Sequence, residues 1–310
     1  MDAANPRSAV SLEQPQGVAP FPQVERLHTM APVVELPNAL TCDVEDYFQV
    51  SAFEHLVPKS SWHEWSCRVE RNMDQVLEIY AERGAKGTFF TLGWIAEHYP
   101  GVVRKIAAEG HEVASHGYQH ERVWNQTADS FRDDIDRTRK LLQDLSGQPV
   151  VGFRAASWSL DKRTPWAHQV MAECGYTYSS SIYPISHDHY GLPDAPLQPF
   201  VEKTSGLLEV PASTFRLAGR NLPSAGGGYF RLFPLPLSRW LIDNVRQRNG
   251  VPAVFYFHPW EIDPDQPRMA GISLKTRFRH YVNLGRFEAR LRRLLQHGRW
   301  DRMDRIYLEC

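Results

Sequence analysis

The sequence has no long hydrophobic run. No stretch of its 310 residues approaches the roughly 20 consecutive apolar residues that a membrane-spanning helix needs. The N-terminus also lacks a basic segment followed by an apolar one, which excludes the pattern of a secretory signal peptide. We therefore expect a cytoplasmic protein whose contact with a membrane, if any, is peripheral.

The sequence also has few cysteines, almost no net charge and no phosphate-binding glycine pattern. Four cysteines, without a Cys-x-x-Cys pair, exclude a disulfide framework and a zinc knuckle, so we expect free thiols at Cys42, Cys67, Cys174 and Cys310. A net charge of -1 excludes the overall basic footprint of a protein that coats nucleic acid. No glycine-rich loop follows the first apolar run, which disfavours a nucleotide-binding open sheet. What stands out instead is 13 histidines and 9 tryptophans.

The chain divides into a leader, one domain and a short tail. Residues 1–37 are rich in Pro, Ala, Gln and Val without periodicity, which is typical of a disordered leader. Short apolar runs then alternate with amphipathic helical stripes over residues 38–300, and residues 301–310 are expected to form a tail. Repeated strand and helix units imply parallel strands with crossover helices, and a barrel-like α/β fold is favoured over an open sheet.

Chemically active side chains follow the apolar runs, at the strand ends where α/β barrels place their chemistry. The first run is followed by Asp43, Glu45 and Asp46, a later one by His116 and His120, the next by Arg154, and the last by His258. Each residue alone is more often a surface, capping or core group than a functional one. Together they offer a carboxylate and two imidazoles, which suit a facial metal site with open positions.

This ordered set resembles the five-motif signature of polysaccharide deacetylases of the NodB-homology, carbohydrate esterase 4-like group. The segments Asp-Val-Glu-Asp-Tyr-Phe-Gln-Val and Phe-His-Pro-Trp-Glu-Ile-Asp-Pro are similar to deacetylases of exosortase-associated (PEP-CTERM) exopolysaccharide loci with a DUF3473-type C-terminal region. The resemblance covers about residues 38–295. It implies a distorted, incomplete (β/α)7 barrel in which residues 220–300 form the family-specific C-terminal part.

The resemblance also implies a reaction and a role for each residue. The reaction is metal-dependent hydrolysis of N-acetyl groups from N-acetylated sugars of a bacterial exopolysaccharide or its precursor. His116, His120 and Glu45 hold one divalent metal ion, Zn²⁺ in the first place and Co²⁺, Mn²⁺ or Ni²⁺ as alternatives, with Asp46 as a substitute for Glu45. Asp43 is the general base that activates the bound water, Arg154 keeps Asp43 ionised, and His258 protonates the departing amine.

Aromatic residues beside these positions are the candidates for substrate contact. Trp158 and Trp260 are expected to bind the sugar, and Phe257, with Phe255, is expected to line a pocket for the acetyl methyl group. The sequence departs from the common family pattern in two places. It lacks adjacent aspartates in the first motif, and it has Ala156-Ser157-Trp158 where Pro-Tyr is usual after the arginine.

Two other functions and one possible interaction surface remain as hypotheses. Relatives on this fold open small cyclic amides or imides, and an inactive glycan-binding scaffold is a third possibility. The segment after Arg268 is rich in arginine, and its helix is expected to pack on the barrel with its arginines facing water. A secondary hypothesis is that the face with Arg290, Arg292 and Arg293 contacts anionic lipid or an anionic glycan held at the inner membrane surface. The protein would then associate peripherally with the inner membrane or with the exopolysaccharide machinery.

Overall fold

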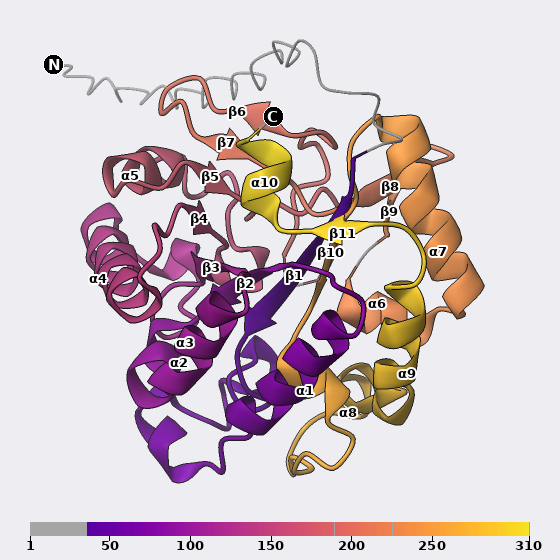
Figure 1. Cartoon of the computed structure of the whole chain (residues 1–310). Coiled ribbons are helices and arrows are strands. Elements are labelled where there is room, and N and C mark those ends of the chain that lie inside the picture. The colour runs from indigo at the N-terminus through magenta and orange to yellow at the C-terminus, as the bar shows by residue number, and fades with distance from the viewer. Residues whose placement is uncertain (1–35, 189, 225, 310) are drawn as a thin grey trace, which may run out of the picture.

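A single curled sheet forms the centre of the computed structural model, which describes residues 36–188, 190–224 and 226–309. Most of the predicted leader and Cys310 lie outside those residues. Helices surround the sheet (Figure 1). Its strand order is β10 (Val254–Phe257), β1 (Asn38–Val44), β2 (Thr88–Thr91), β3 (Glu112–Ser115), β4 (Gly152–Phe153), β5 (Tyr178–Ser179), β7 (Leu208–Glu209) and β6 (Phe200–Val201).

These strands are parallel except for β6, which runs antiparallel to β7. Arg154 follows β4, and its guanidinium reaches Asp43 on β1 although β2 and β3 lie between them. Such a contact requires a strongly curled sheet. The strand order nevertheless does not close, so the predicted distorted, incomplete α/β barrel is confirmed.

Helices follow the strands in the predicted alternation. The first half of the chain contains α1 (Val69–Ala81), α2 (Gly93–His98), α3 (Pro100–Ala108), α4 (Ala128–Ser146) and α5 (Ala167–Glu173). The second half adds the hairpin β8 (Thr214–Leu217) and β9 (Arg220–Pro223), then α6 (Gly227–Leu232), α7 (Leu235–Asn244), α8 (Leu274–Tyr281), α9 (Leu284–Leu294), β11 (Trp300–Asp301) and α10 (Met303–Tyr307).

Local sequence explains where several helices begin and end. Pro100 opens α3, because a first-turn proline needs no amide partner, and it separates α3 from α2. At the start of α4, Thr127 and Ser130 form a reciprocal capping box. Gly147 ends α4 at a φ of 66°, which is a left-handed conformation that glycine adopts without strain.

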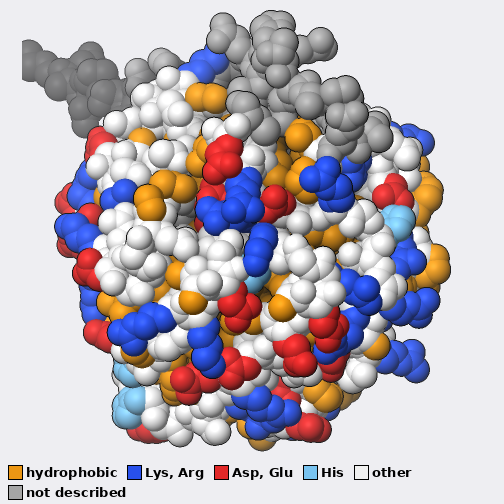
Figure 2. Space-filling model, in the orientation of Figure 1, with side chains coloured by type: hydrophobic (Ala, Val, Ile, Leu, Met, Phe, Trp, Pro, Cys, Tyr) orange, Lys and Arg blue, Asp and Glu red, His pale blue; other side chains and the backbone are white. Residues whose placement is uncertain are grey.

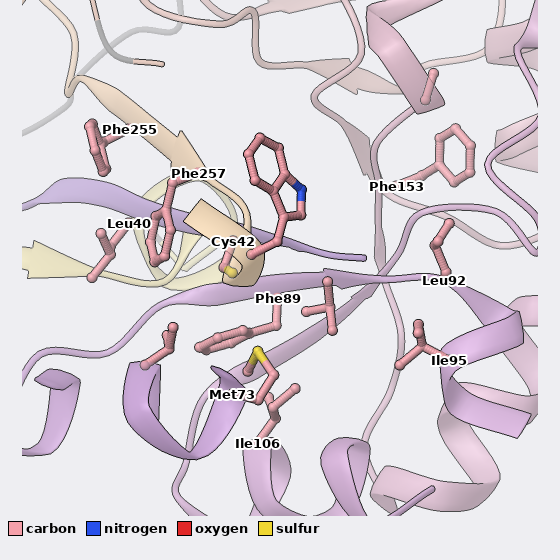
Figure 3. Close-up of a cluster of buried hydrophobic side chains, with 14 of the residues drawn as sticks. Leu40, Cys42, Met73, Phe89, Leu92, Ile95, Ile106, Phe153, Phe255 and Phe257 are labelled. Carbon is pink, nitrogen blue, oxygen red and sulfur yellow. The ribbon is translucent and has the colours of Figure 1, made fainter. Parts of the chain in front are cut away.

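Strand alternation separates the hydrophobic core from the site. On β1, Leu40 and Cys42 belong to the large cluster beneath the helices, where Phe89 and Phe257 also pack (Figure 3). Thr41 and Asp43 alternate with these residues along β1. Their side chains point to the opposite face of the sheet, because successive side chains of a strand point to opposite faces. Both are buried inside the barrel, so the end of β1 delivers a carboxylate to its interior.

The segment 301–310, set apart in the sequence as a tail, contributes structure at the base of the barrel through its described residues 301–309. β11 pairs with the start of β1, and α10 begins at Met303, which is fully buried. The Met303 amide donates a hydrogen bond to the Thr88 hydroxyl at 2.8 Å. This part of the chain is therefore tied to β1 and β2.

The arginines of α9 do not form a free basic face. Its apolar residues pack on the core as expected, with Phe287 and Leu291 fully buried. The Arg290 guanidinium, however, donates to the backbone carbonyls of Arg231 and Phe233, and Arg292 pairs with Glu82 and Glu288. The expectation that these arginines face water is therefore wrong for two of the three, because the chain supplies closer acceptors.

The surface carries charges of both signs. Lysine, arginine, aspartate and glutamate side chains are interspersed on the face shown in Figure 2, in keeping with the near-zero net charge. Cys42, Cys67 and Cys174 are free thiols, as predicted. Within the described ranges, no helix combines the length and the apolar character that crossing a bilayer requires.

Candidate active site

Asp43 and Arg154 form a buried ion pair at the carboxyl ends of the strands. Arg154 Nη1 lies 2.7 Å from Asp43 Oδ1 and 2.9 Å from the Thr41 hydroxyl. Its other nitrogens donate to the backbone carbonyl and the hydroxyl of Ser180, each at 3.1 Å. A guanidinium bound on several sides holds the carboxylate in one orientation. Oδ2 of Asp43 carries none of these contacts and faces the site.

Three side chains converge beside Asp43 as a possible metal-binding group. Glu45, His116 and His120 each offer a ligand atom, and these atoms lie within 4.8 Å of one another. Nδ1 of His116 is 2.8 Å from the backbone carbonyl of Arg154, so Nδ1 carries the proton and Nε2 keeps its lone pair. Nε2 of His120 lies 3.0 Å from Glu45 Oε2. That buried carboxylate oxygen has no hydrogen bond from the described residues.

The electrostatics of the three groups also suit a cation. Burial lowers the pKa of His116, and burial together with the neighbouring His116 and His258 lowers the pKa of His120 well below its usual range. Both rings are therefore neutral and able to donate lone pairs. Burial raises the pKa of Glu45 to about 7, although the charge of His258 opposes the shift. A divalent cation would favour the ionised form of Glu45 and satisfy its unbonded oxygen.

His258 approaches this group from the last strand, β10. Its Nε2 lies 3.6 Å from Glu45 Oε1 and 4.0 Å from Asp43 Oδ2, and its side chain is 22% exposed. Nδ1 of the same ring is 2.9 Å from Glu261 Oε1. Burial lowers the pKa of His258, but the charges of Glu45 and Glu261 outweigh it and raise the pKa to about 9. His258 thus faces the metal-binding group with its pKa raised above the usual value.

Asp46 takes no part in this arrangement, although it follows Glu45 directly. Its Oδ1 accepts the Tyr47 amide at 2.7 Å, and its Oδ2 accepts the Arg68 amide just before α1. Both oxygens are therefore held by backbone donors. Between the two carboxylates that the sequence leaves open as a metal ligand, the geometry favours Glu45.

Two family models match the chain. Residues 63–179 match the polysaccharide deacetylase model, and residues 180–308 match a domain of unknown function, DUF3473. Residues 63–179 of the chain belong to the polysaccharide deacetylase family. His116, His120 and Arg154 lie in the first matched segment and His258 in the second, so the candidate site is built from both.

Several curated relatives match part of this chain. Peptidoglycan-N-acetylglucosamine deacetylase of Bacillus cereus is 36% identical over 94 residues, which are 30% of this chain and 34% of the relative. Peptidoglycan deacetylase of Helicobacter pylori is 26% identical over 36% of this chain and 38% of the relative. Chitooligosaccharide deacetylase of Azorhizobium caulinodans is 27% identical over 28% and 52%. The chain thus spans about a third to a half of the length of these relatives.

The fold agrees with a solved structure over most of both chains. A protein from Mycobacterium smegmatis assigned to the polysaccharide deacetylases superposes with a TM-score of 0.56 at 20% sequence identity. The match covers 89% of this chain and 91% of the other. This likeness supports the same barrel architecture for this chain.

The aromatic residues predicted to contact substrate lie in three different settings. Trp260 is stacked between the His258 ring, 5.1 Å away, and the His280 ring, 4.3 Å away, so neither face is open to a sugar. Its indole N–H instead donates to Glu45 at 3.3 Å. Phe257 packs in the core beneath the helices (Figure 3), because strand alternation directs Tyr256 to the site side.

Phe255 lies on the same core side of β10 as Phe257, and the two rings are 6.1 Å apart. The predicted methyl pocket is therefore not formed by these two residues. Trp158 is nearer the chemistry, with the Arg154 guanidinium 4.8 Å from its ring centre. It is only 5% exposed, and its backbone has a φ of 53°, which is uncommon for a bulky residue. Of the predicted substrate contacts, Trp158 is the one that lies beside the arginine that holds Asp43.

Two residues of the site were missed in the sequence. Glu261 lies in the Phe-His-Pro-Trp-Glu segment, three positions after His258. That spacing on a helical turn is the signal that could have identified Glu261. Arg231 binds Glu261, yet it lies 30 positions earlier along the chain. No local pattern links Arg231 to the site, so only the fold reveals it.

Proposed function

We propose that this deacetylase hydrolyses N-acetyl groups of N-acetylated sugars in a bacterial exopolysaccharide or its precursor. The observation that carries the proposal is the convergence of one base, three ligand atoms and one acid. Asp43, the group of Glu45, His116 and His120, and His258 surround one point at the strand ends. Amide hydrolysis needs these components together.

The donor set suits a divalent ion such as Zn²⁺, because two neutral imidazoles and one carboxylate are typical catalytic zinc ligands. Such an ion, when bound, lowers the pKa of a water molecule and polarises the acetyl carbonyl. The residues of the chain do the rest. Asp43 accepts the proton of the attacking water, and Arg154 holds its carboxylate ionised and oriented. His258 donates its Nε2 proton to the amine nitrogen as the C–N bond breaks.

The decisive experiment is acetate release from N-acetylhexosamine oligomers before and after removal of metal with a chelator. We expect activity to vanish on removal and to return with Zn²⁺, Co²⁺, Mn²⁺ or Ni²⁺, and their ranking identifies the best cofactor. The Asp43→Asn variant should lose about 10²- to 10⁴-fold in kcat while retaining metal, because it cannot accept the proton. The His120→Ala variant should lose bound metal, as measured by elemental analysis. Activity that survives both substitutions rejects the mechanism.

Two alternatives from the sequence are separated by the choice of substrate. Release of acetate from sugar oligomers with no opening of cyclic imides supports the deacetylase. The reverse result identifies a small-ring hydrolase on the same fold. Binding of the oligomers without turnover, in a protein shown to contain metal, identifies a glycan-binding scaffold.

A cytoplasmic location and peripheral contact with an anionic membrane stay predictions. The best surface for that contact is α8, where Leu274 and Phe278 are 84% and 57% exposed beside Lys275, Arg277 and Arg279. Exposed apolar side chains flanked by basic ones suit an anionic bilayer surface. Sedimentation with phosphatidylglycerol vesicles should decrease for the double variant Leu274→Glu, Phe278→Glu. Equal sedimentation of variant and wild type rejects this surface.

A further inference from the structure

The proton on His258 is oriented by a second buried carboxylate, Glu261. Glu261 Oε1 lies 2.9 Å from His258 Nδ1 and accepts the His258 backbone amide at 3.1 Å. Because a carboxylate accepts from Nδ1–H, the other ring nitrogen, Nε2, is the one that faces Glu45 and Asp43. Glu261 thus fixes both the rotation of the imidazole and the nitrogen that reaches the substrate.

Arg231 holds Glu261 in turn. Its Nε lies 2.6 Å from Glu261 Oε2, and both side chains are at most 2% exposed. The remaining guanidinium donors bind three backbone carbonyls at the end of α8 and in the turn that follows it, those of His280 at 2.8 Å, Arg279 at 3.2 Å and Val282 at 2.9 Å. The guanidinium therefore links the acid side of the site to that turn.

The start of α6 leaves no room for a side chain beside this carboxylate. A Cβ atom at Gly227 would lie 2.1 Å from Glu261 Oε1 and 2.6 Å from its carboxyl carbon. Gly227 therefore lets the backbone of α6 approach Glu261 closely, which brings Arg231, four residues later on the same helix, to the other carboxylate oxygen.

Gly227, Arg231, His258, Glu261 and the α8–α9 turn all lie within residues 180–308, the segment that matches the model of unknown function. The metal-binding histidines and Arg154 lie outside it, in residues 63–179. We propose that this C-terminal segment serves as the scaffold for the acid half of the site, in which Glu261 and Arg231 are positioning residues for His258. This inference rests on the proposed deacetylation.

In the step concerned, the C–N bond breaks, the Nε2 proton of His258 moves to the amine nitrogen, and the Nδ1 proton stays between His258 and Glu261. Asp43 has meanwhile accepted one proton from water. Amide and water are thus converted to acetic acid and neutral amine, and the proton gained by Asp43 equals the proton lost by His258. An aryl ester differs because its phenolate leaves without needing a proton, so its hydrolysis depends far less on an oriented acid.

The test is the Glu261→Gln variant, assayed on both substrate classes. We expect kcat for N-acetylhexosamine oligomers to fall about 10²-fold with KM unchanged, while hydrolysis of 4-nitrophenyl acetate stays within about 2-fold of wild type. Glu288→Gln is the matched control, since Glu288 lies in the same segment, is 38% exposed and bonds to Gln75 and Arg292 away from the site. An equal fall on both substrates, or no fall on either, overturns the proposal.

A readout independent of activity separates this inference from the proposed function. In ¹⁵N-histidine NMR spectra, we expect a slowly exchanging Nδ1–H signal for His258, identified by its loss in His258→Gln and altered in Glu261→Gln. If wild type releases no acetate but shows this signal, the function fails and the contact stands. If Glu261→Gln unfolds because Arg231 is left unpaired, the double variant Glu261→Gln, Arg231→Met removes that charge and takes its place. An unchanged signal in a folded variant overturns the positioning role.

Discussion

At the scale of single residues, the site depends on charges that are buried and therefore must be paired. Asp43 and Arg154 are 3% and 1% exposed, and Glu261 and Arg231 are equally hidden. Leaving one member of such a pair without its partner is costly, because the remaining charge cannot reach water. Each arginine thus contributes to folding and also fixes the direction of a carboxylate.

Arg154→Lys tests whether Arg154 fixes the direction of the Asp43 carboxylate. A lysine keeps the charge but cannot donate to Asp43, Thr41 and Ser180 at once. We expect kcat for deacetylation to fall about 10-fold or more and the free energy of unfolding to fall by about 2 kcal/mol, since buried acceptors lose their donors. Acetate release and urea denaturation measure the two effects. Wild-type activity in this variant would show that the orientation of Asp43 is unimportant.

Trp260→Phe tests the indole that donates to Glu45. Phenylalanine preserves an aromatic ring between His258 and His280 but removes the N–H donor. Because groups that orient a metal ligand tune its affinity, we expect metal to bind about 10-fold more weakly. Competition with a coloured chelator measures the affinity. A sugar-stacking role for Trp260 would instead raise KM and leave metal affinity unchanged.

At the scale of elements, the ends of the parallel strands decide which side chains meet. β1, β3, β4 and β10 deliver Asp43, His116, Arg154 and His258 to one edge of the sheet. At the opposite end of the strands, β11 pairs with β1, and α10 packs under β1 and β2. The C-terminal helix thus supports the strand that carries the base.

Met303→Ala tests this support. The side chain is fully buried with Ala39 and Phe90 in one cluster, so truncation leaves a cavity. We expect the free energy of unfolding to fall by about 2 to 5 kcal/mol, as measured by urea denaturation. Leu308→Ala is the control, because Leu308 is 39% exposed and should cost much less. If both substitutions lower the free energy of unfolding by the same small amount, α10 does not stabilise the barrel.

At the scale of the whole molecule, stability should fall in acid partly because of His111. Its Nδ1 accepts the Gly87 amide at 3.2 Å, and burial, with Lys86 and Arg302 nearby, lowers the pKa to about 3. A group whose folded pKa is lowered takes up a proton more readily when unfolded. The fold is therefore destabilised as the pH falls from about 6.5 towards 3, by at most about 1.4 kcal/mol per pH unit from this residue.

His111→Gln isolates that contribution, because its amide oxygen can still accept from Gly87 but does not titrate. Urea unfolding measured at a series of pH values should give a shallower acid dependence for the variant than for wild type. Identical slopes would mean that His111 is protonated without cost in the folded chain.

The sequence by itself determined the alternation of strands and helices and the strand-end positions of the base, the ligands and the acid. It could do so because hydrophobic periodicity and the placement of polar residues after apolar runs are local properties. The contact of Glu261 with His258 could also have been predicted from the sequence, because the two residues are three positions apart on one helical turn.

Only the tertiary structure decided which neighbours each side chain has. It placed Glu45 with the histidines and Asp46 under the start of α1, buried Phe257 behind β10, and covered both faces of Trp260. It also brought Arg231 to Glu261 across 30 positions of sequence. The physical reason is that curling of the sheet and close helix approach set these contacts, and neither is encoded in the spacing of a few adjacent residues.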